Sequence, residues 1–243
     1  EALRLDPNDF KAHYNLGIIL GKKGLLDDAI KEYNEALRID PNNSAAHYNL
    51  GIVLDRKGLL DDAIKEYNEA LRIGPNNYTT HFFLGKAYDE KGLLDDAIRE
   101  YNEALKIDPA DSKTHNYLGI ILVKKGLLDD AIKEFKEALR IDPNNSEFHN
   151  NLGATFVKKG LLDDAIKEYN EALRIDPNNN EIRIKLGNVY YNRGLLDDAM
   201  KEFKEALKID PADSKTHNYL GIILVKKGLL DDAMKEFNES LRL

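Results

Sequence analysis

The chain has 243 residues and no cysteine, and its 35 basic against 43 acidic residues leave a net charge of −8. This balance argues against a general phosphate-binding surface, which usually needs clustered positive charge, and the lack of cysteine excludes disulfides and thiolate metal sites. No apolar run approaches the roughly 18 residues of a membrane span and no charged-then-apolar leader opens the chain, so we expect a soluble, cytoplasmic protein that binds neither nucleic acid nor membrane.

The chain opens with the phrase EALRLDP at residues 1–7, which matches EALRIDP at residues 35–41. There is no initiator methionine. We therefore expect residues 1–9 to be the tail of a preceding repeat, and the chain to be a piece of a longer protein.

A fixed period runs through the rest of the sequence. The phrase beginning GLLDDA starts at glycines 24, 58, 92, 126, 160, 194 and 228, and every interval is 34 residues. Such regularity is typical of stacked copies of one supersecondary unit. We predict a single array over 1–243, with repeats at 10–43, 44–77, 78–111, 112–145, 146–179, 180–213 and 214–243.

Each unit contains the pattern of two amphipathic helices. A stretch from about Ser44 to Lys57 ends at Gly58, where a left-handed C-cap is expected. In the other stretch, two aspartates such as Asp27 and Asp28 occupy the first turn, where carboxylates offset the positive end of the helix dipole. Asp40 precedes a proline and should end that helix, because a residue before proline is pushed out of helical geometry.

The repeated unit resembles the tetratricopeptide repeat in its length, its central Leu-Gly pair, its Ala and aromatic positions and its junction proline. In the second unit the matching residues are Leu50, Gly51, Leu54, Gly58, Ala63, Tyr67, Ala70 and Pro75. The resemblance covers the whole chain and implies an all-α fold, a right-handed α-solenoid superhelix of seven helix-turn-helix repeats. The tryptophan usual in the family is replaced by histidine at 13, 47, 81, 115, 149 and 217, and by Arg183 in the sixth unit.

The seven copies differ mainly on one side of the first helix. When each unit is numbered from its first-helix start (residues 10, 44, 78, 112, 146, 180 and 214), positions 3, 4, 7, 10, 11 and 14 share one side of a helix. A leucine at position 7 of every unit marks this side as packing. Positions 2, 5, 6, 9, 12 and 13 form the other side, which we call the first-helix face, and they collect most of the variation.

In tetratricopeptide arrays the first helices line a concave groove that holds peptide segments of partner proteins, so the resemblance and the variation indicate the same face. An exposed strip of isoleucine, valine and aromatic residues usually marks a binding site, and asparagine can hold a peptide backbone through both donor and acceptor groups. The candidate peptide-binding residues in the first four repeats are Lys11, Tyr14, Asn15, Ile18, Tyr48, Asn49, Ile52, Phe82, Lys86, Asn116, Ile120 and Val123. In the last three they are Asn150, Asn151, Val157, Ile184, Asn188, Tyr191, Asn218, Ile222 and Val225.

This partial asparagine ladder resembles those of O-linked N-acetylglucosamine transferases and kinesin light chains, although Phe83, Tyr117, Lys185 and Tyr219 interrupt it at position 6. The carboxylate clamp of chaperone-binding family members needs lysine at position 5. No unit has one there, which argues against capture of a chaperone C-terminus.

Two recurring polar patterns also admit structural explanations. Stacked helices lie on the order of 8–10 Å apart, too far for the histidine column to share one zinc ion at about 2.1 Å per nitrogen. We interpret these histidines as half-buried rings in the tryptophan position, with a pH-sensitive interface as the alternative. The aspartate pairs occupy equivalent helix starts and are interpreted as dipole compensation rather than catalytic or calcium-binding carboxylates.

Residues 103–131 are identical to residues 205–233, so the fourth and seventh units would present the same first-helix face. This identity fits either a repetitive partner or a recent duplication without functional meaning, and we favour the second. The last helix lacks a polar capping helix on its outer side, which indicates either further chain or association of the ends.

The sequence therefore predicts a non-enzymatic adaptor or scaffold that binds a partner peptide or helix in the groove, with no cofactor and no metal. Two alternatives stay open: a structural scaffold that self-assembles end to end through uncapped terminal repeats, and the substrate-recruiting arm of a larger enzyme.

Overall fold

The computed structural model describes residues 8–243, and within them it contains fourteen α-helices and no strand. The predicted all-α class and its helix pairs are confirmed. Of the expected tail of a preceding repeat, residues 1–7 lie outside the described residues. The superhelical form of the whole array stays a prediction.

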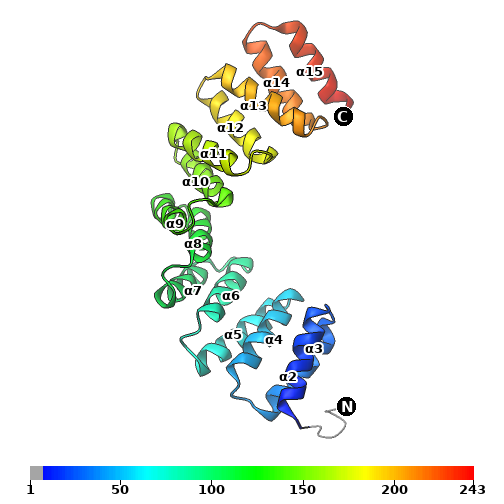
Figure 1. Cartoon of the computed structure of the whole chain (residues 1–243), viewed down its shortest axis with the longest axis vertical. Helices are drawn as coiled ribbons and strands as arrows, with labels where there is room; N and C mark the ends of the chain where they lie inside the picture. Colours follow the sequence, from blue (N-terminus) through cyan, green and yellow to red (C-terminus); the bar gives the residue numbers. More distant parts are fainter. Residues whose placement is uncertain (1–7) are drawn as a thin grey trace. The chain divides into compact units, whose positions relative to one another are not determined.

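The chain divides into two compact units, residues 1–125 and residues 126–243. Within each unit, helices that are consecutive in the sequence lie next to one another (Figure 1). The first unit contains α2 (Phe10–Lys22), α3 (Leu26–Ile39), α4 (Ser44–Arg56), α5 (Leu60–Ile73), α6 (Tyr78–Glu90), α7 (Leu94–Ile107) and α8 (Ser112–Lys124). The second contains α9 (Leu128–Ile141), α10 (Ser146–Lys158), α11 (Leu162–Ile175), α12 (Asn180–Asn192), α13 (Leu196–Ile209), α14 (Ser214–Lys226) and α15 (Leu230–Arg242).

Local sequence signals place the helix ends. The side chain of Asn43 accepts a hydrogen bond from the backbone N–H of Ala46 at 3.1 Å, which caps α4. At the other end Gly58 has φ +80°, and the N–H of Leu59 donates to the carbonyl of Leu54 at 2.9 Å. This is a Schellman motif, and the left-handed C-cap predicted for Gly58 is confirmed. The helix end predicted before proline is also confirmed: α3 ends before Asp40, whose φ of −129° is no longer helical.

The core of each unit lies between the constant face of the second helices and the packing side of the first helices. In α5, Ala63, Tyr67 and Ala70 have no exposed surface, and Ala63 and Tyr67 pack in one cluster with Leu50 of α4. Gly51 is required at this contact because a Cβ there would lie 2.6 Å from Cε1 of Tyr67. The equivalent cluster of the second unit is built around Phe203 and Leu220.

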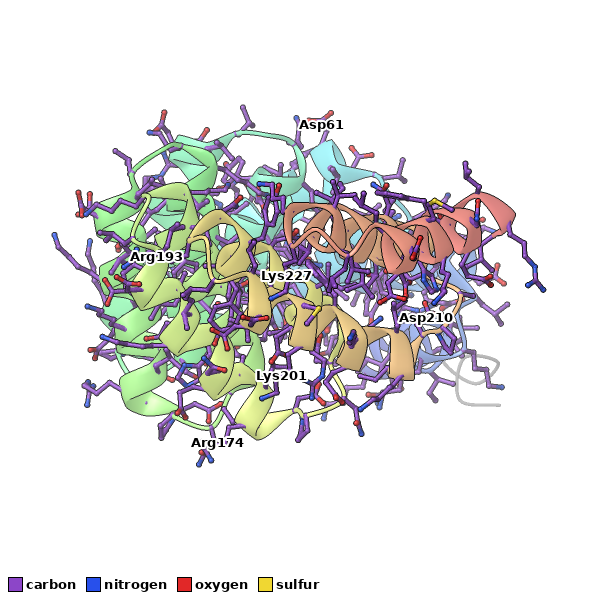
Figure 2. The ribbon with its side chains drawn as sticks, turned by 90° about the horizontal axis from the view of Figure 1, so that it is seen from above. Asp61, Arg174, Arg193, Lys201, Asp210 and Lys227 are labelled. Carbon is purple, nitrogen blue, oxygen red and sulfur yellow. The ribbon has the colours of Figure 1, made fainter. Side chains whose placement is uncertain are left out.

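The first aspartate of the pair has a second role in the first six repeats, which was not predicted from the sequence. It pairs with a basic residue of the next repeat 30 positions later, as Asp27 does with Lys57 and as Asp163 does with Arg193 at 2.8 Å. These hydrogen bonds lower the pKa of the Asp27 and Asp163 carboxyls. Intrahelical pairs also occur on the outer surface, where Arg174 bonds Glu171 at 2.7 Å and extends away from the ribbon (Figure 2).

Candidate functional site

The two sides of each first helix differ in exposure. In α4, Ala46, Leu50 and Val53 are buried at positions 3, 7 and 10, whereas Tyr48 and Ile52 remain partly exposed. The same separation recurs in the first helices after α4, because their constant leucine and the glycine beside it face the second helix, whereas in α2 the packing-side Ile19 is 51% exposed. Most variable residues of the first-helix face therefore keep accessible surface, but the candidate Asn116 is buried.

In the first unit this face carries a network of aromatic rings. Tyr14 stacks on Phe10 with ring centroids 5.7 Å apart, and its hydroxyl accepts a hydrogen bond from Nδ2 of Asn49 at 2.8 Å. Further along, Tyr48 meets Phe83 edge to face at 6.0 Å. Such pairs hold their rings in fixed orientations, so the face offers a preformed apolar surface.

Charged groups interrupt the aromatic surface near the ends of α6 and α8. Lys124 donates to Asp89 at 2.6 Å, and Lys86 lies 3.3 Å from Glu90. Burial, reinforced by the Glu90 charge, raises the pKa of Asp55 on the neighbouring helix. This part of the face is therefore polar and already paired within the unit.

In the second unit a hollow of about 210 Å³ opens between α12 and α14. Phe203 of α13 and Tyr219 stack at 5.5 Å with their rings 19° apart, and Phe203 is buried. We call this space the aromatic hollow. It is lined by Asn188, Tyr191, Asn192, Phe203, Tyr219 and Ile222, of which Asn188, Tyr191 and Ile222 are candidate residues.

Lys226 flanks the hollow. Its Nζ lies 4.2 Å from the centroid of the Tyr191 ring, a cation–π arrangement. Lys226 and Asn192 were not among the residues predicted from the sequence. Both stand at position 13, and the signal for them was the neighbouring pair of aromatic residues at positions 6 and 12.

The identical helices α8 and α14 do not present the same site, which corrects the expectation from the internal duplication. Lys124 of α8 pairs with Asp89, whereas its counterpart Lys226 lies over Tyr191. Asn116 is buried at 3% exposure, and its counterpart Asn218 is exposed. The difference between Asp89 and Tyr191 comes from the preceding first helix, not from the duplicated segment.

The other candidate residues lie on the first-helix face with varying exposure. In α12, Lys185 donates to Oδ1 of Asn150 at 3.1 Å and pairs with Glu181 at 2.6 Å. The exposed candidates are Lys11, Asn15, Asn218 and Val225. Those that are partly exposed include Ile18, Phe82, Ile120, Val123, Asn150, Asn151, Val157 and Ile184.

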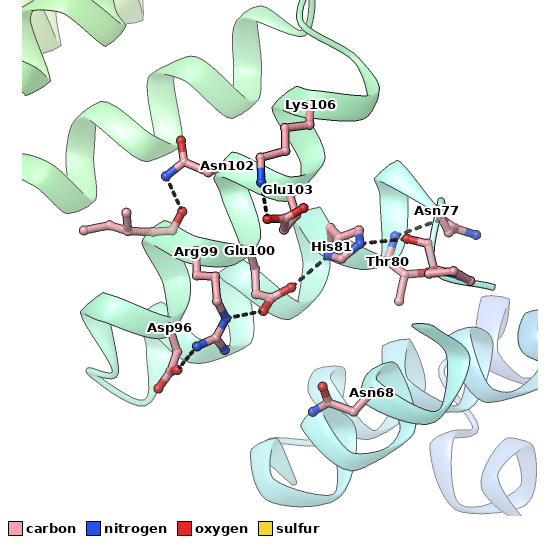
Figure 3. A network of polar contacts seen from close by, with 12 residues as sticks. Asn68, Asn77, Thr80, His81, Asp96, Arg99, Glu100, Asn102, Glu103 and Lys106 are labelled. Atoms are coloured by element: carbon pink, nitrogen blue, oxygen red, sulfur yellow. Dashed lines mark hydrogen bonds and ion pairs between the residues drawn. The ribbon is translucent and has the colours of Figure 1, made fainter. Parts of the chain in front are cut away.

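Four of the histidines at position 4, at residues 47, 81, 149 and 217, each make two contacts. Nδ1 of His81 lies 2.8 Å from Glu100 (Figure 3), and its Nε2 lies 3.0 Å from the carbonyl oxygen of Pro75. His149 and His217 repeat this pattern with their own glutamate and proline. The hydrogen bond to the glutamate raises the pKa of His81 and of His149. The histidine column is a set of separate histidine–glutamate contacts with largely buried side chains, which fits its structural interpretation.

The sequence matches the family profile described as TPR repeat over residues 22–58, 56–92, 85–126, 119–160, 155–194 and 187–228, and the tetratricopeptide repeat profile over residues 1–31. The chain belongs to the tetratricopeptide repeat family. Proteins of this family are in general non-enzymatic interaction modules, and this chain has the fold of a protein-interaction scaffold. No curated protein matches the sequence.

Solved structures share this fold. MamA is 30% identical and superposes with a TM-score of 0.63 over 65% of this chain and 93% of its own. A tetratricopeptide repeat protein from Parabacteroides merdae is 19% identical, with a TM-score of 0.73 over 96% of this chain and 92% of its own. YrrB, described as a TPR protein with an unusual peptide-binding site, is 24% identical, with a TM-score of 0.64 over 72% of this chain and 91% of its own.

Among the helices of residues 8–243, none combines the length and the apolar character needed to cross a membrane.

Proposed function

We propose that this protein is an adaptor that binds an extended peptide segment of a partner protein across its first-helix face. The observation that carries the proposal is the contrast within each first helix. Constant residues such as Leu50 are buried against the second helix, while variable aromatic, aliphatic and amide side chains such as Tyr48 and Ile52 stay accessible.

The chemistry of this face suits a peptide. Partly exposed isoleucine and aromatic side chains supply apolar surface, and covering the remaining area of each contributes less than the about 1.5–3 kcal/mol of a fully exposed side chain. Amides such as those of Asn49 and Asn188 can accept from and donate to a peptide backbone, whatever side chains it carries. YrrB, whose likeness to this chain is one of fold, carries a peptide-binding site by its description.

The test begins with peptides selected from a random phage-displayed library against the immobilised chain. Their amidated synthetic versions are then titrated by calorimetry against Ile52→Asp and Ile184→Asp, one variant in each unit. We expect one or both substitutions to weaken binding by about tenfold or more, because a charge would be buried under the peptide.

Lys65→Asp, at an exposed site of α5, is the matched control for a new carboxylate and should bind normally. Circular dichroism verifies that all variants fold. Selected peptides that bind every variant equally would contradict the proposal, as would a library that yields no binder.

A second function, end-to-end self-association, is favoured by the outer side of α15. Leu230, Met234 and Leu241 are 60%, 61% and 86% exposed. The equivalent residues of α13, Leu196, Met200 and Leu207, pack against the apolar cluster of the second unit. Sedimentation velocity over a range of concentrations tests this function: association that Met234→Lys abolishes supports it, and a monomer at every concentration contradicts it.

A further inference from the structure

We propose that the aromatic hollow is an anchor site for one large apolar side chain of the partner peptide, and that Lys226 pairs with an acidic side chain next to that anchor. This inference deepens the proposed function and depends on it. It commits to one occupant, an extended internal segment in which an aromatic or long aliphatic residue is flanked by aspartate or glutamate.

The size and lining of the hollow indicate the anchor. An apolar cavity of about 150 Å³ accommodates benzene, so a hollow of about 210 Å³ has room for a phenyl ring or a long aliphatic chain. The stacked rings of Phe203 and Tyr219 and the side chain of Ile222 supply its apolar walls. Buried Phe203 fixes this surface from below, which limits the conformational entropy lost when a ligand binds.

The amides in the lining indicate how the rest of the segment is held. Asn188 and Asn192 stand four residues apart on α12, so they lie on the same side of that helix. Each amide offers both a donor and an acceptor, which matches the alternating groups of an extended backbone. The hollow therefore combines one apolar position with two amides that can contact a peptide backbone whatever side chains the peptide carries.

The preference for an acidic side chain is inferred by comparing α8 with α14, which have the same sequence. Lys124 is satisfied by Asp89 of the preceding first helix. At the equivalent position before α14 the chain has Tyr191, and within residues 8–243 Lys226 forms no ion pair but lies over the Tyr191 ring. The ammonium group is held over an aromatic ring with its charge uncompensated, so a carboxylate supplied by the partner would be attracted to it.

The same comparison argues against an equivalent anchor site between α6 and α8. Where the hollow has Asn188, Tyr191 and Asn192, helix α6 has Lys86, Asp89 and Glu90. Both carboxylates already pair with lysines of the unit, so this place offers an acidic peptide no uncompensated cation.

The experiment is an NMR titration of the full isotope-labelled chain with acetylated, amidated peptides. The main probe is Gly-Ser-Gly-Asp-Phe-Asp-Gly-Ser-Gly, and companion probes replace the phenylalanine by alanine or both aspartates by lysine. We expect the main probe to bind with a Kd on the order of 1 mM and to shift the side-chain amides of Asn188 and Asn192 most. The alanine probe should not bind in this range.

Lys226→Glu should weaken the main probe by about fivefold and strengthen the lysine probe by a similar factor, because the sign of the pair is reversed. Lys124→Glu, in the identical sequence of α8, is the matched control and should change neither titration. Thermal unfolding of both variants verifies that the chain still folds.

The anchor proposal is overturned if the main probe does not bind, if its shifts lie outside the hollow, or if both lysine variants behave alike. It is also overturned if a peptide with a free terminal phenylalanine and no acidic side chain binds more tightly than the main probe. If library-selected peptides bind the first-helix face and ignore Tyr191→Ala and Lys226→Glu, the anchor site fails while the proposed function stands. If nothing binds that face, the proposed function fails.

Discussion

At the scale of single residues, Arg183 explains the chemistry of the histidines at position 4. In the sixth repeat it donates to Glu202 at 3.0 Å and to the carbonyl oxygen of Pro177 at 2.9 Å. These are the two contacts that His149 makes with Glu168 and Pro143 in the fifth repeat. A carbonyl oxygen only accepts, so Nε2 must carry a proton, and the glutamate favours a second proton on Nδ1. Arginine replaces histidine here because the position favours a cation with two donors.

This chemistry predicts how stability depends on pH. The hydrogen bond with Glu168, aided by the nearby charge of Glu171, raises the pKa of His149 in the folded state. The contribution of the protonated ring is complete below the unfolded pKa near 6.5 and is lost as pH rises through the raised pKa. We expect the free energy of unfolding, measured with urea, to decrease from pH 6 to pH 9.

His149→Arg should reduce that decrease and stabilise the chain at pH 9 by roughly 1 kcal/mol, because a charged hydrogen bond is kept at every pH. His149→Gln is the control, since it cannot carry the charge and should weaken the chain most at pH 6. A stability that rises with pH in the unchanged chain would contradict this assignment of protons.

A second residue-scale prediction concerns Gly51, which touches the ring of Tyr67. A Cβ at Gly51 would lie 2.6 Å from that fully buried ring, so Gly51→Ala should cost about 1–3 kcal/mol of stability despite the better helix propensity of alanine. Gly21 provides the comparison, because its Cβ would meet Val53 at 3.4 Å. Denaturation should show a much smaller loss of stability for Gly21→Ala. Equal losses in the two variants would show that the Tyr67 contact does not determine the cost of the substitution.

At the scale of the helices, the ends were predictable because they depend on local rules. A glycine at the left-handed position, an aspartate before proline and acids in a first turn each act within a few residues, so Gly58 and Asp40 could be read directly. The pairing of Asp27 with Lys57 could not, because it depends on how one hairpin packs on the next. Position 7 leucines were assigned correctly to the packing side for the local reason of helical periodicity.

Gly74 departs from this pattern at the end of α5. The equivalent residue is aspartate after five other second helices, and Gly74 has a backbone conformation, φ −132° and ψ 84°, close to that of Asp40. Asp40 also accepts a hydrogen bond from Nδ2 of Asn43 at 3.1 Å, which Gly74 cannot do. Gly74→Asp should therefore stabilise the chain by about 0.5–1 kcal/mol through lower unfolded-state entropy and one new hydrogen bond.

Thermal unfolding measures this change. Gly74→Ala separates the two contributions, because it restricts the unfolded backbone without supplying an acceptor. Since a Cβ at this position would approach Oγ of Ser44 at 3.3 Å, a net destabilisation in both variants would show that the steric contact outweighs the gain.

At the scale of the whole molecule, stability in a repeat array is a sum of local terms, so a core defect should remain in its own unit. Leu186 of α12 has no exposed surface, and Leu186→Ala should cost about 2–5 kcal/mol. Hydrogen exchange should then show faster opening of α12 and α13 while amides of α4 keep their protection. Ile184→Ala, a partly exposed change in the same helix, should have a much smaller effect, and uniform loss of protection would indicate a fully cooperative chain.

The first-helix face could be located from the sequence because seven aligned copies reveal which positions vary. The aromatic hollow, its most distinctive feature, could not be located from the sequence. The aromatic hollow needs Tyr191 and Asn192 from one repeat, Phe203 from its second helix and Tyr219 from the next repeat, so no single repeat contains the pattern. Lys226 was overlooked for the same reason, since an isolated lysine at the end of a helix looks like ordinary solvated surface.

The different surroundings of α8 and α14 have a consequence for how such proteins acquire new partners. Because the surface offered by a helix is completed by the helix before it, recognition is combinatorial: a site is specified by an ordered pair of neighbours. Shuffling existing repeats would create binding surfaces that none of them possessed, without a single point mutation. A small set of interchangeable repeats can thus yield many specificities, provided that the interfaces between neighbouring repeats remain uniform.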